Sequence, residues 1–178
     1  MGWKMAVLAI ARMGHPVLRQ SAQAVPDPTA PDIQRLIADM HETLEESGGV
    51  GLAAPQVFVS QRLFIYSVPL ARSEGEDDPP LPVQALINPV LTPVDDEKVL
   101  RAEGCLSLPD WRGEVPRYKR IWYAGFDQHG QKVEGMATGF RAHVMQHEMD
   151  HLDGILYPMR MTDMSKFGFA KEITRYGA

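Results

Sequence analysis

The feature that most constrains this chain is the segment from Gln146 to Gly154, which reads QHEMDHLDG and contains the pattern H-E-x-x-H. On an α-helix, side chains four residues apart project from one face, so His147 and His151 can hold one metal ion together. Glu148 follows the first histidine, where it can move a proton to and from a water molecule at the metal. The segment therefore predicts a helix that carries most of a hydrolytic site.

The residues around this pattern support a helix over 138–153. Gly154 stands three residues after His151, where a helix that ends there commonly has a glycine. The flanking apolar residues recur at the spacing of a helix that faces a protein core, namely Val144, Met145, Leu152 and Ile155. A solvated surface helix would not need these residues, so the pattern favours a buried metal helix.

The third metal ligand is left open by this segment. One class of metalloproteases has a third histidine at the position that Tyr157 occupies here, so that completion fails. Another class uses a downstream glutamate, and Glu172 is the only glutamate after the motif. Cys105 is the remaining candidate, because a thiolate is a strong ligand for Zn²⁺ or Fe²⁺. A lone cysteine is more often a small buried apolar residue, so spacing alone does not decide between Cys105 and Glu172.

The bulk properties suit one soluble domain spanning residues 1–178, because 178 residues with 44% hydrophobic and 23% charged residues can bury a sizeable core. A net charge of −5 without a Lys/Arg cluster argues against binding to DNA or to an anionic membrane. The apolar patch near the start is short and interrupted by Arg12, unlike a signal peptide. With a single cysteine, these features predict a cytoplasmic protein.

Periodicity predicts one further clear helix, which begins at Pro31 and stops at Gly48–Gly49. Its apolar stripe consists of Ile33, Leu36, Ile37, Met40 and Leu44. The remaining expectations are an irregular arm at 1–31, a loop at 49–56, a mobile surface loop at Arg72–Pro82, strands at 57–68, 83–94, 97–102, 114–126 and 131–136, and a last helix at 162–175.

Strands that are grouped together and flanked by separate helices favour an α+β fold over alternating β-α-β units. We expect antiparallel or mixed β-sheets packed around a central metal-binding helix, with an N-terminal helix and a C-terminal helix. The methionines at 145, 149, 159, 161 and 164 are expected to fill the core.

Three segments in this order and spacing resemble the peptide deformylase family: GVGLAAPQ at 49–56, EGCLS at 103–107 and the QHEMDHLDG segment. The resemblance extends over nearly the whole chain, and the three motifs together are highly specific. It implies removal of the N-formyl group from the initiator methionine of new polypeptides, with N-formylmethionyl peptides and nascent chains as substrates and a transient ribosome contact. The insertion at 72–82 and the chain end resemble a branch found in some bacteria and in organelles.

The resemblance also implies a set of site residues. Cys105, His147 and His151 would bind Fe²⁺, which Zn²⁺, Ni²⁺ or Co²⁺ can replace, and water would take the fourth position. Glu148 would act as general base and acid. Gln56 and the backbone N–H of Leu106 would donate hydrogen bonds to the oxyanion.

Further expectations concern substrate binding. Gly49 and Gly51 would let the substrate backbone approach as an added strand, and Gly104 would allow a tight turn. Arg112 and Glu103 are expected to support the site, with Glu103 orienting a metal-bound histidine. A pocket for the methionine side chain would be lined by Val50, Leu106, Phe140, His143 and Val144. Of these, His143 could also be a fourth metal ligand, although a role in the pocket wall or as a hydrogen-bonded helix residue is favoured. Asp150 is expected to be a surface or supporting carboxylate.

Overall fold

The computed structural model describes residues 6–176, so the first five residues of the expected N-terminal arm lie outside it. The helices are α1 (Pro31–Ser47), α2 (Gly139–Leu152) and α3 (Ala170–Tyr176). The strands are β1 (Gly51–Ala53), β2 (Leu63–Val68), β3 (Leu81–Pro93), β4 (Lys98–Cys105), β5 (Leu108–Tyr118), β6 (Arg120–Phe126), β7 (Lys132–Thr138) and β8 (Gly168–Phe169). Short 3₁₀ turns cover Pro16–Arg19, Ala54–Val57, Leu70–Arg72, Tyr157–Arg160 and Met164–Lys166.

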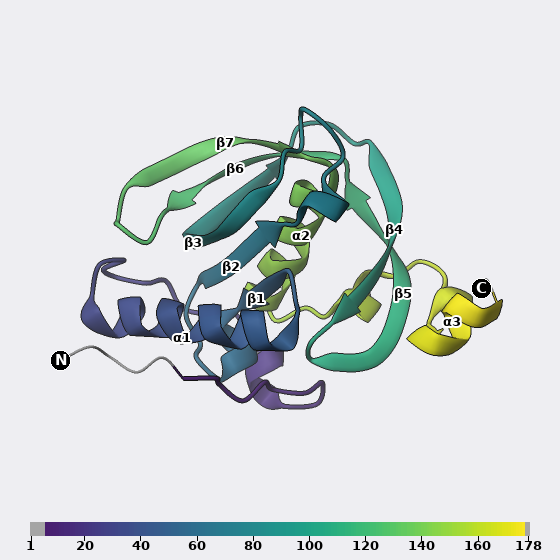
Figure 1. Ribbon diagram of the computed structural model, residues 1–178, viewed down its shortest axis with the longest axis horizontal. Helices are drawn as coiled ribbons and strands as arrows, with labels where there is room; N and C mark the ends of the chain where they lie inside the picture. Colours follow the sequence, from purple (N-terminus) through teal and green to yellow (C-terminus); the bar gives the residue numbers. More distant parts are fainter. Residues whose placement is uncertain (1–5, 177–178) are drawn as a thin grey trace.

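The strands form two antiparallel sheets, as Figure 1 shows. The larger sheet has the order β1-β2-β3-β6-β7, and the smaller has the order β4-β5-β8. The α+β architecture with antiparallel sheets, an N-terminal helix and a C-terminal helix is therefore confirmed. Within residues 6–176, no helix combines the length and the apolar character needed to cross a membrane.

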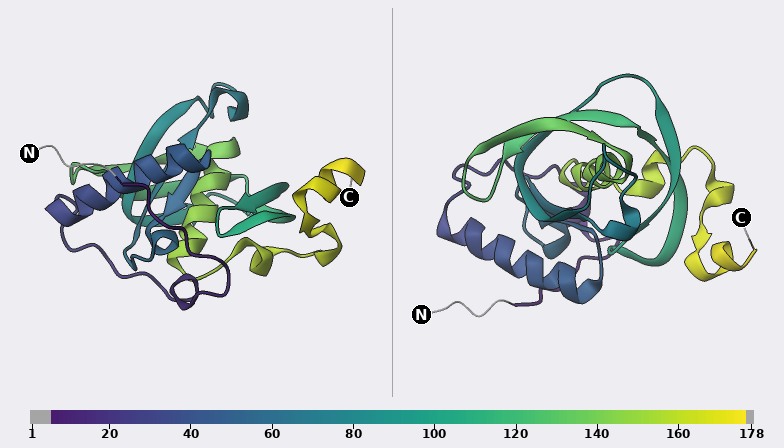
Figure 2. Two further views of the ribbon diagram at one scale, coloured as in Figure 1. Left: turned by 60° about the horizontal axis from the view of Figure 1, so that its bottom comes forward. Right: turned by 45° about the horizontal axis from the view of Figure 1, so that its top comes forward.

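Helix α2 lies inside the curve of the larger sheet, and Figure 2 shows it nearly end-on with strands around it. Strand β2 contributes to the core on both faces of the larger sheet, because its alternate residues point to opposite faces. Phe64 and Tyr66 pack with α2 in one core cluster, whereas Leu63 and Ile65 pack with α1 in another. Each fully buried side chain of this kind contributes roughly 1.5–3 kcal/mol. Apart from Ser67, the strand consists of apolar and aromatic residues because both of its faces are covered.

The sequence pattern of α1 agrees closely with its structure. Pro31 occupies the first turn, and Gly48 ends the helix in the left-handed conformation with φ of 65°. Four residues of the apolar stripe are buried, and Leu36 is partly buried against the same core cluster. This helix covers the outer side of β1 and β2, so it supports the strand that borders the site.

Several predicted boundaries were wrong. The loop at 49–56 contains β1, and the expected strand at 57–68 begins only at Leu63 because a 3₁₀ turn and loop precede it. The single strand expected at 114–126 is divided at Lys119 into β5 and β6, which belong to different sheets. The expected helix at 162–175 is replaced up to residue 169 by a 3₁₀ turn and β8, because Gly168 pairs with Arg112.

Two further expectations need correction. The loop at 72–82 does lie on the surface, but its Asp78 is only 1% exposed and is anchored on α2. Among the five methionines expected in the core, Met145 is fully buried, but Met159 and Met164 are 68% and 59% exposed. Both exposed methionines lie in short 3₁₀ turns after the metal helix, where helical periodicity no longer applies.

Candidate metal centre and active site

Helix α2 and the end of β4 bring three potential metal ligands together. The ligand atoms of Cys105, His147 and His151 all lie within 4.8 Å of one another. Cys105 Sγ is 3.3 Å from His151 Nε2. This is the only such group of three or more His, Cys, Asp or Glu side chains found among residues 6–176. Glu172, the rival third ligand, is an exposed residue of α3 and does not belong to the group.

The donor set fits a catalytic transition metal. One thiolate and two imidazoles suit Fe²⁺ or Zn²⁺, and three protein donors leave a coordination position open for water or substrate. Burial raises the pKa of the Cys105 thiol, but His151 and His147 outweigh this effect and hold it well below the usual range. The backbone N–H of Ser107 also donates to Sγ over 3.4 Å. The sulfur is therefore prepared to act as a thiolate ligand.

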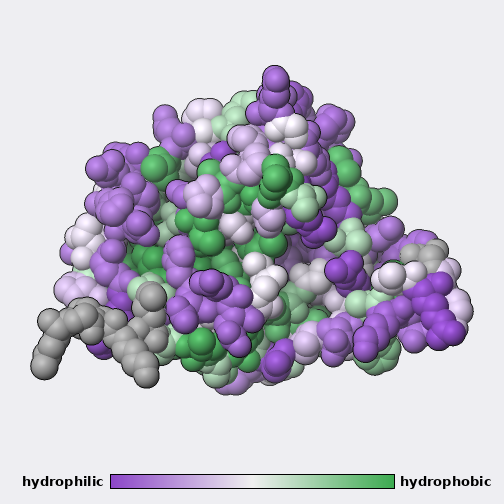
Figure 3. Space-filling model, in the orientation of Figure 1, coloured by the Kyte–Doolittle hydropathy of each residue, from purple (hydrophilic) through white to green (hydrophobic). Residues whose placement is uncertain are grey.

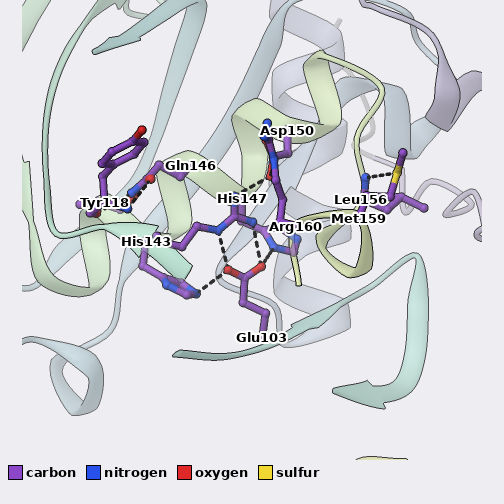
Figure 4. Close-up of polar contacts among 11 residues, drawn as sticks. Glu103, Tyr118, His143, Gln146, His147, Asp150, Leu156, Met159 and Arg160 are labelled. Carbon is purple, nitrogen blue, oxygen red and sulfur yellow. Dashed lines mark hydrogen bonds and ion pairs between the residues drawn. The ribbon is translucent and has the colours of Figure 1, made fainter. Parts of the chain in front are cut away.

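The carboxylate of Glu103 holds one of these histidines in place. Figure 4 shows Glu103 between His147 and His143, with Oε2 2.7 Å from His147 Nδ1. That contact leaves His147 Nε2 for the metal. Burial opposes ionisation of Glu103, but hydrogen bonds from His147 and Arg117 lower its pKa well below the usual range. The structure thus places Glu103 where it can orient a metal-bound histidine.

Arg117 and Arg160 belong to this network, and the sequence patterns revealed neither of them. Arg117 donates to both oxygens of Glu103, over 2.7 and 3.0 Å, and to Asp150 Oδ2 over 2.5 Å. Arg160 binds the other side of Asp150 over 2.8 Å. One signal was present: Gly113, Val115 and Arg117 occupy alternate, inward positions of β5. A charged residue at an inward position indicates a buried ionic contact.

We expect Arg117→Met to destabilise the protein by about 3–5 kcal/mol, because it leaves the buried Glu103 without its arginine and removes one of the two arginines that bind Asp150. Urea unfolding measures this change. The matched control is Lys119→Met, which removes a cation two residues away from an ion pair with Glu97 whose side chains are 47% and 53% exposed. That exposed pair contributes about 0–1 kcal/mol. Equal losses in the two variants would show that the buried network does not stabilise the fold.

Glu148 is a buried carboxylate with an unsatisfied oxygen. Its side chain is on the same helix as the two histidines, and the residue is 3% exposed. Oε2 is buried without a hydrogen-bond partner among the described residues. Burial raises the pKa of Glu148 to about 7. A buried carboxyl group with a raised pKa in a pocket is typical of a group that transfers protons.

Gly51 leaves the space that the Glu148 carboxylate occupies. A Cβ atom built on Gly51 would lie 2.8 Å from Glu148 Cδ and closer still to Oε1. The sequence predicts that this glycine lets a substrate backbone approach closely, and the structure shows that it also makes room for Glu148. Gln56, the last residue of the GVGLAAPQ segment, lies in the 3₁₀ turn that follows β1.

For Gly51→Ala we expect kcat to fall at least about tenfold, because the new methyl group displaces the carboxylate and small misplacements of catalytic groups are costly. Bound metal should remain at one ion per chain. The matched control is Gly168→Ala, where a Cβ would meet Ile173 at an ordinary 3.6 Å. Steady-state kinetics and metal analysis of both variants check the expectation, which unchanged kcat in Gly51→Ala would contradict.

The amide of Gln56 is held in a fixed orientation beside the sulfur. Its Oε1 accepts a hydrogen bond of 2.9 Å from the backbone N–H of Ala53. Its Nε2 therefore faces Ser107 Oγ at 3.2 Å and Cys105 Sγ at 3.6 Å. Leu106 lies directly after Cys105, and its carbonyl accepts a hydrogen bond of 3.0 Å from Arg12. Arg12 had not been expected at the site.

A cavity of about 640 Å³ opens over these groups. It is lined by all of the expected substrate-binding residues, namely Gly49, Val50, Gly51, Glu103, Gly104, Leu106, Arg112, Phe140, His143 and Val144. Arg12, Arg72 and Trp111 also line it. Figure 3 shows apolar side chains gathered across the middle of this view, with hydrophilic ones around them. Because Val50, Leu106, Phe140 and Val144 are among its lining residues, the cavity can accept an apolar side chain next to the metal group.

His143 borders the cavity without joining the metal group. Its Nε2 is 3.2 Å from Glu103 Oε1, and its ring stacks on that of Phe140 with 6.3 Å between centroids. Burial lowers the pKa of His143 to about 4, so the imidazole is neutral near pH 7. These contacts favour the pocket-wall role over that of a fourth ligand. Asp150, 5% exposed, is a supporting carboxylate and not a surface one.

The chain is similar in sequence to members of one known protein family. The family model described as polypeptide deformylase matches residues 7–167. The chain is 45% identical over 160 residues to peptide deformylase 1 of Nitrosomonas europaea, with 90% of each protein covered. It is 46% identical over 163 residues to peptide deformylase 1 of Bordetella pertussis, with 92% of each covered.

Solved structures give the same result. A class I type b peptide deformylase from Acinetobacter baumannii with bound Met-Ala-Ser is 37% identical with a TM-score of 0.81, and 89% of this chain and 100% of that one are covered. A peptide deformylase from Ehrlichia chaffeensis in complex with actinonin is 31% identical with a TM-score of 0.82, and the coverage is 91% and 92%.

Proposed function

The chain belongs to the peptide deformylase family, and on this premise we propose how its own residues remove the N-formyl group from N-formylmethionyl peptides. Deformylation is a metal-dependent amide hydrolysis in which water and the formyl amide give formate and a free amine. One observation carries the assignment to this site: the Cys105, His147 and His151 ligand atoms converge beside the buried carboxylate of Glu148.

We propose that Cys105, His147 and His151 hold one Fe²⁺ per chain. Zn²⁺, Ni²⁺ or Co²⁺ can replace iron, because thiolate and imidazole ligands accept all of these ions. When bound, the cation supplies Lewis acidity that polarises the formyl oxygen and acidifies a water molecule. Glu103 keeps His147 oriented toward the cation through the 2.7 Å contact at Nδ1. Iron and its thiolate ligand are both oxidisable, so an iron-loaded protein should be handled without air.

Proton transfer and charge stabilisation fall to the remaining side chains. Glu148 takes the proton of the attacking water and delivers it to the leaving amine nitrogen. Gln56 Nε2 and the backbone N–H of Leu106 donate hydrogen bonds to the oxyanion that develops on the formyl group. A donor of this kind is typically worth about 3 kcal/mol in the transition state. The Ala53 hydrogen bond fixes the Gln56 amide before substrate arrives, so little reorganisation is needed.

The lining of the cavity supports a proposal for how the substrate's first residue is recognised. An apolar methionine side chain would enter between Val50, Leu106, Phe140, His143 and Val144. Strand β1 lies at the end of the larger sheet, so its outer edge is available for an extended peptide to add as a strand. Gly49 and Gly51 lie along that approach, and Arg112 and Gly104 line the cavity beyond. The structure of the relative from Acinetobacter baumannii with bound Met-Ala-Ser supports a peptide as the ligand.

The domain organisation, the compartment and the partners are proposed on the same basis. We infer that residues 1–178 form a single catalytic domain that acts on nascent chains in a bacterial cytoplasm, with transient contact to the ribosome. The relatives named above are bacterial proteins of similar length. The acidic composition supports a protein that binds neither DNA nor membranes.

The reaction type is tested with formyl-Met-Ala-Ser and acetyl-Met-Ala-Ser. The iron-loaded protein should release formate and Met-Ala-Ser from the first and leave the second almost uncleaved, because an acetyl group needs more space at the metal. Mass spectrometry identifies which bond is cut. Cleavage between Met and Ala would instead indicate a metallopeptidase and would refute the proposal.

A further inference from the structure

The loop at 73–80 contains one buried carboxylate, that of Asp78, which is 1% exposed. The loop itself holds this residue in position. The Asp78 backbone N–H donates to Gly75 O over 3.1 Å, and its carbonyl accepts a hydrogen bond of 2.8 Å from Ser73 Oγ. The backbone N–H of Glu74 donates to Oδ2 over 3.3 Å. The side chain is therefore fixed from within an otherwise exposed loop.

The carboxylate caps the first turn of the metal helix, although it lies about 60 residues upstream. Asp78 Oδ2 accepts a hydrogen bond of 2.8 Å from the backbone N–H of Phe140, and Oδ1 accepts one of 3.1 Å from that of Arg141. Thr138, the residue at the N-cap position, makes no side-chain capping bond. The negative charge also interacts favourably with the helix dipole. The cap that a local Ser, Thr, Asp or Asn would ordinarily provide comes here from the loop.

Gly139 shows how closely the loop and the helix are fitted. Its φ is +58°, and a Cβ atom there would lie 2.6 Å from Asp78 Oδ2. Only glycine adopts this conformation readily and leaves room for the carboxylate. The contact is therefore built from both sides, by the buried aspartate and by the glycine that opens the helix.

Arg72, the residue just before the loop, contacts the cavity wall, and the loop itself contacts the strand that leads to the sulfur ligand. The guanidinium of Arg72 lies 4.7 Å from the centroid of the Phe140 ring, which lines the cavity. Arg101 donates to both carboxylate oxygens of Glu74 and lies four residues before Cys105 in β4. One short segment therefore contacts α2 at its start and β4 near its end.

We propose that Asp78 is a positioning residue for substrate binding: by capping α2, it fixes Phe140 and so sets the shape of the pocket that receives the methionine side chain. This inference rests on the proposed function for the identity of the side chain. His147 lies two helical turns beyond Phe140, so displacement of the first turn affects the cavity wall more than the metal group. The loop at 73–80 thereby gains a role in affinity for the substrate's first residue.

The test compares Asp78→Ala and Asp78→Asn with Asp77→Ala, which removes the same charge from an exposed neighbour in the same loop. In Asp78→Ala, amide exchange at residues 140–141 should accelerate, and KM for formyl-Met-Ala-Ser and Kd for Met-Ala-Ser should rise about three- to tenfold, the effect expected for a lost cap. Bound metal should stay at one ion per chain, and kcat should change less than KM. Asp78→Asn, which keeps one acceptor oxygen, should be intermediate and serves if the alanine variant does not fold.

Three results would overturn the proposal: unchanged exchange at residues 140–141, unchanged KM and Kd despite faster exchange, or equal effects from Asp77→Ala. A purely structural cap would give the second of these, with a lower Tm and an unaltered pocket. Absence of formate release from the wild type would refute the proposed function, whereas amide exchange and Met-Ala-Ser affinity would still decide the role of Asp78.

Discussion

Replacing Glu148 with glutamine should lower kcat by about 10²- to 10⁴-fold, the contribution typical of a positioned general base and acid. Glutamine preserves the shape of the side chain, so the cavity and the three metal ligands should stay in place. Metal content should therefore remain at one ion per chain, and Kd for Met-Ala-Ser should change little. Steady-state rates of formate release, with metal analysis of the same samples, measure the effect.

The pH dependence separates loss of the base from a general disturbance of the site. Burial raises the pKa of Glu148 to about 7, and a bound dication lowers it again by favouring the carboxylate. The base works as a carboxylate, so wild-type kcat/KM should fall on the acidic side, about tenfold per pH unit below a pKa at or under 7. The residual activity of Glu148→Gln should lack this acidic limb. A limb of the same midpoint in both proteins would assign it to another group.

Cys105→Ser should abolish most metal binding and, with it, activity. A serine hydroxyl stays protonated near neutral pH and is a poor replacement for a thiolate as a ligand of Fe²⁺ or Zn²⁺. Since loss of a residue in contact with a ligand already costs about 10- to 100-fold in metal affinity, loss of the ligand itself should exceed that range. Metal titration monitored by calorimetry measures the affinity, and Tm should rise less on metal addition than in the wild type.

The control for Cys105→Ser is Glu172→Gln, which tests the rival ligand directly. Glu172 is an exposed residue of α3 outside the metal group, so this variant should keep wild-type metal affinity and formate release. The opposite pattern, with metal lost in Glu172→Gln and retained in Cys105→Ser, would overturn the assignment of the ligands.

Helices with a clear periodic pattern of residues could be predicted from the sequence. Helix α1 could be predicted because its stripe, its proline and its final glycine all indicate the same boundaries. The metal helix was accessible because two histidines at a spacing of four require a helix in order to meet. Its apolar flanks also predicted that it would be buried, and Leu152 is fully buried in the structure.

The boundary between β5 and β6 could not be predicted from the sequence, because it depends on which sheet each strand joins. Residues 114–126 read as one strand-like run, yet the chain passes from the smaller sheet to the larger one at Lys119. Pairing with strands far away in the sequence decides this division. The C-terminal helix was overestimated for a similar reason, because Gly168 pairs with Arg112 before the helix begins.

Contacts between distant segments also explain which site residues were missed. Arg117 joins Glu103 to Asp150 across three elements, and Asp78 reaches α2 from a loop that reads as charged and exposed. Neither residue belongs to a local motif. Gly51 was noticed as part of a motif, but its neighbour Glu148 is 97 residues away in the chain and only the fold shows their contact. Motifs thus located the reacting groups, whereas their supports required the structure.

The most direct test is to remove bound metal with a chelator, to titrate Fe²⁺ anaerobically into the metal-free protein, and to follow formate release from formyl-Met-Ala-Ser. The account predicts almost no activity without metal and a rise that reaches its plateau at one ion per chain. The same titration of Cys105→Ser should give no plateau in that range. Deformylation by metal-free protein, or full activity of Cys105→Ser at one ion per chain, would contradict a reaction centred on Cys105, His147 and His151.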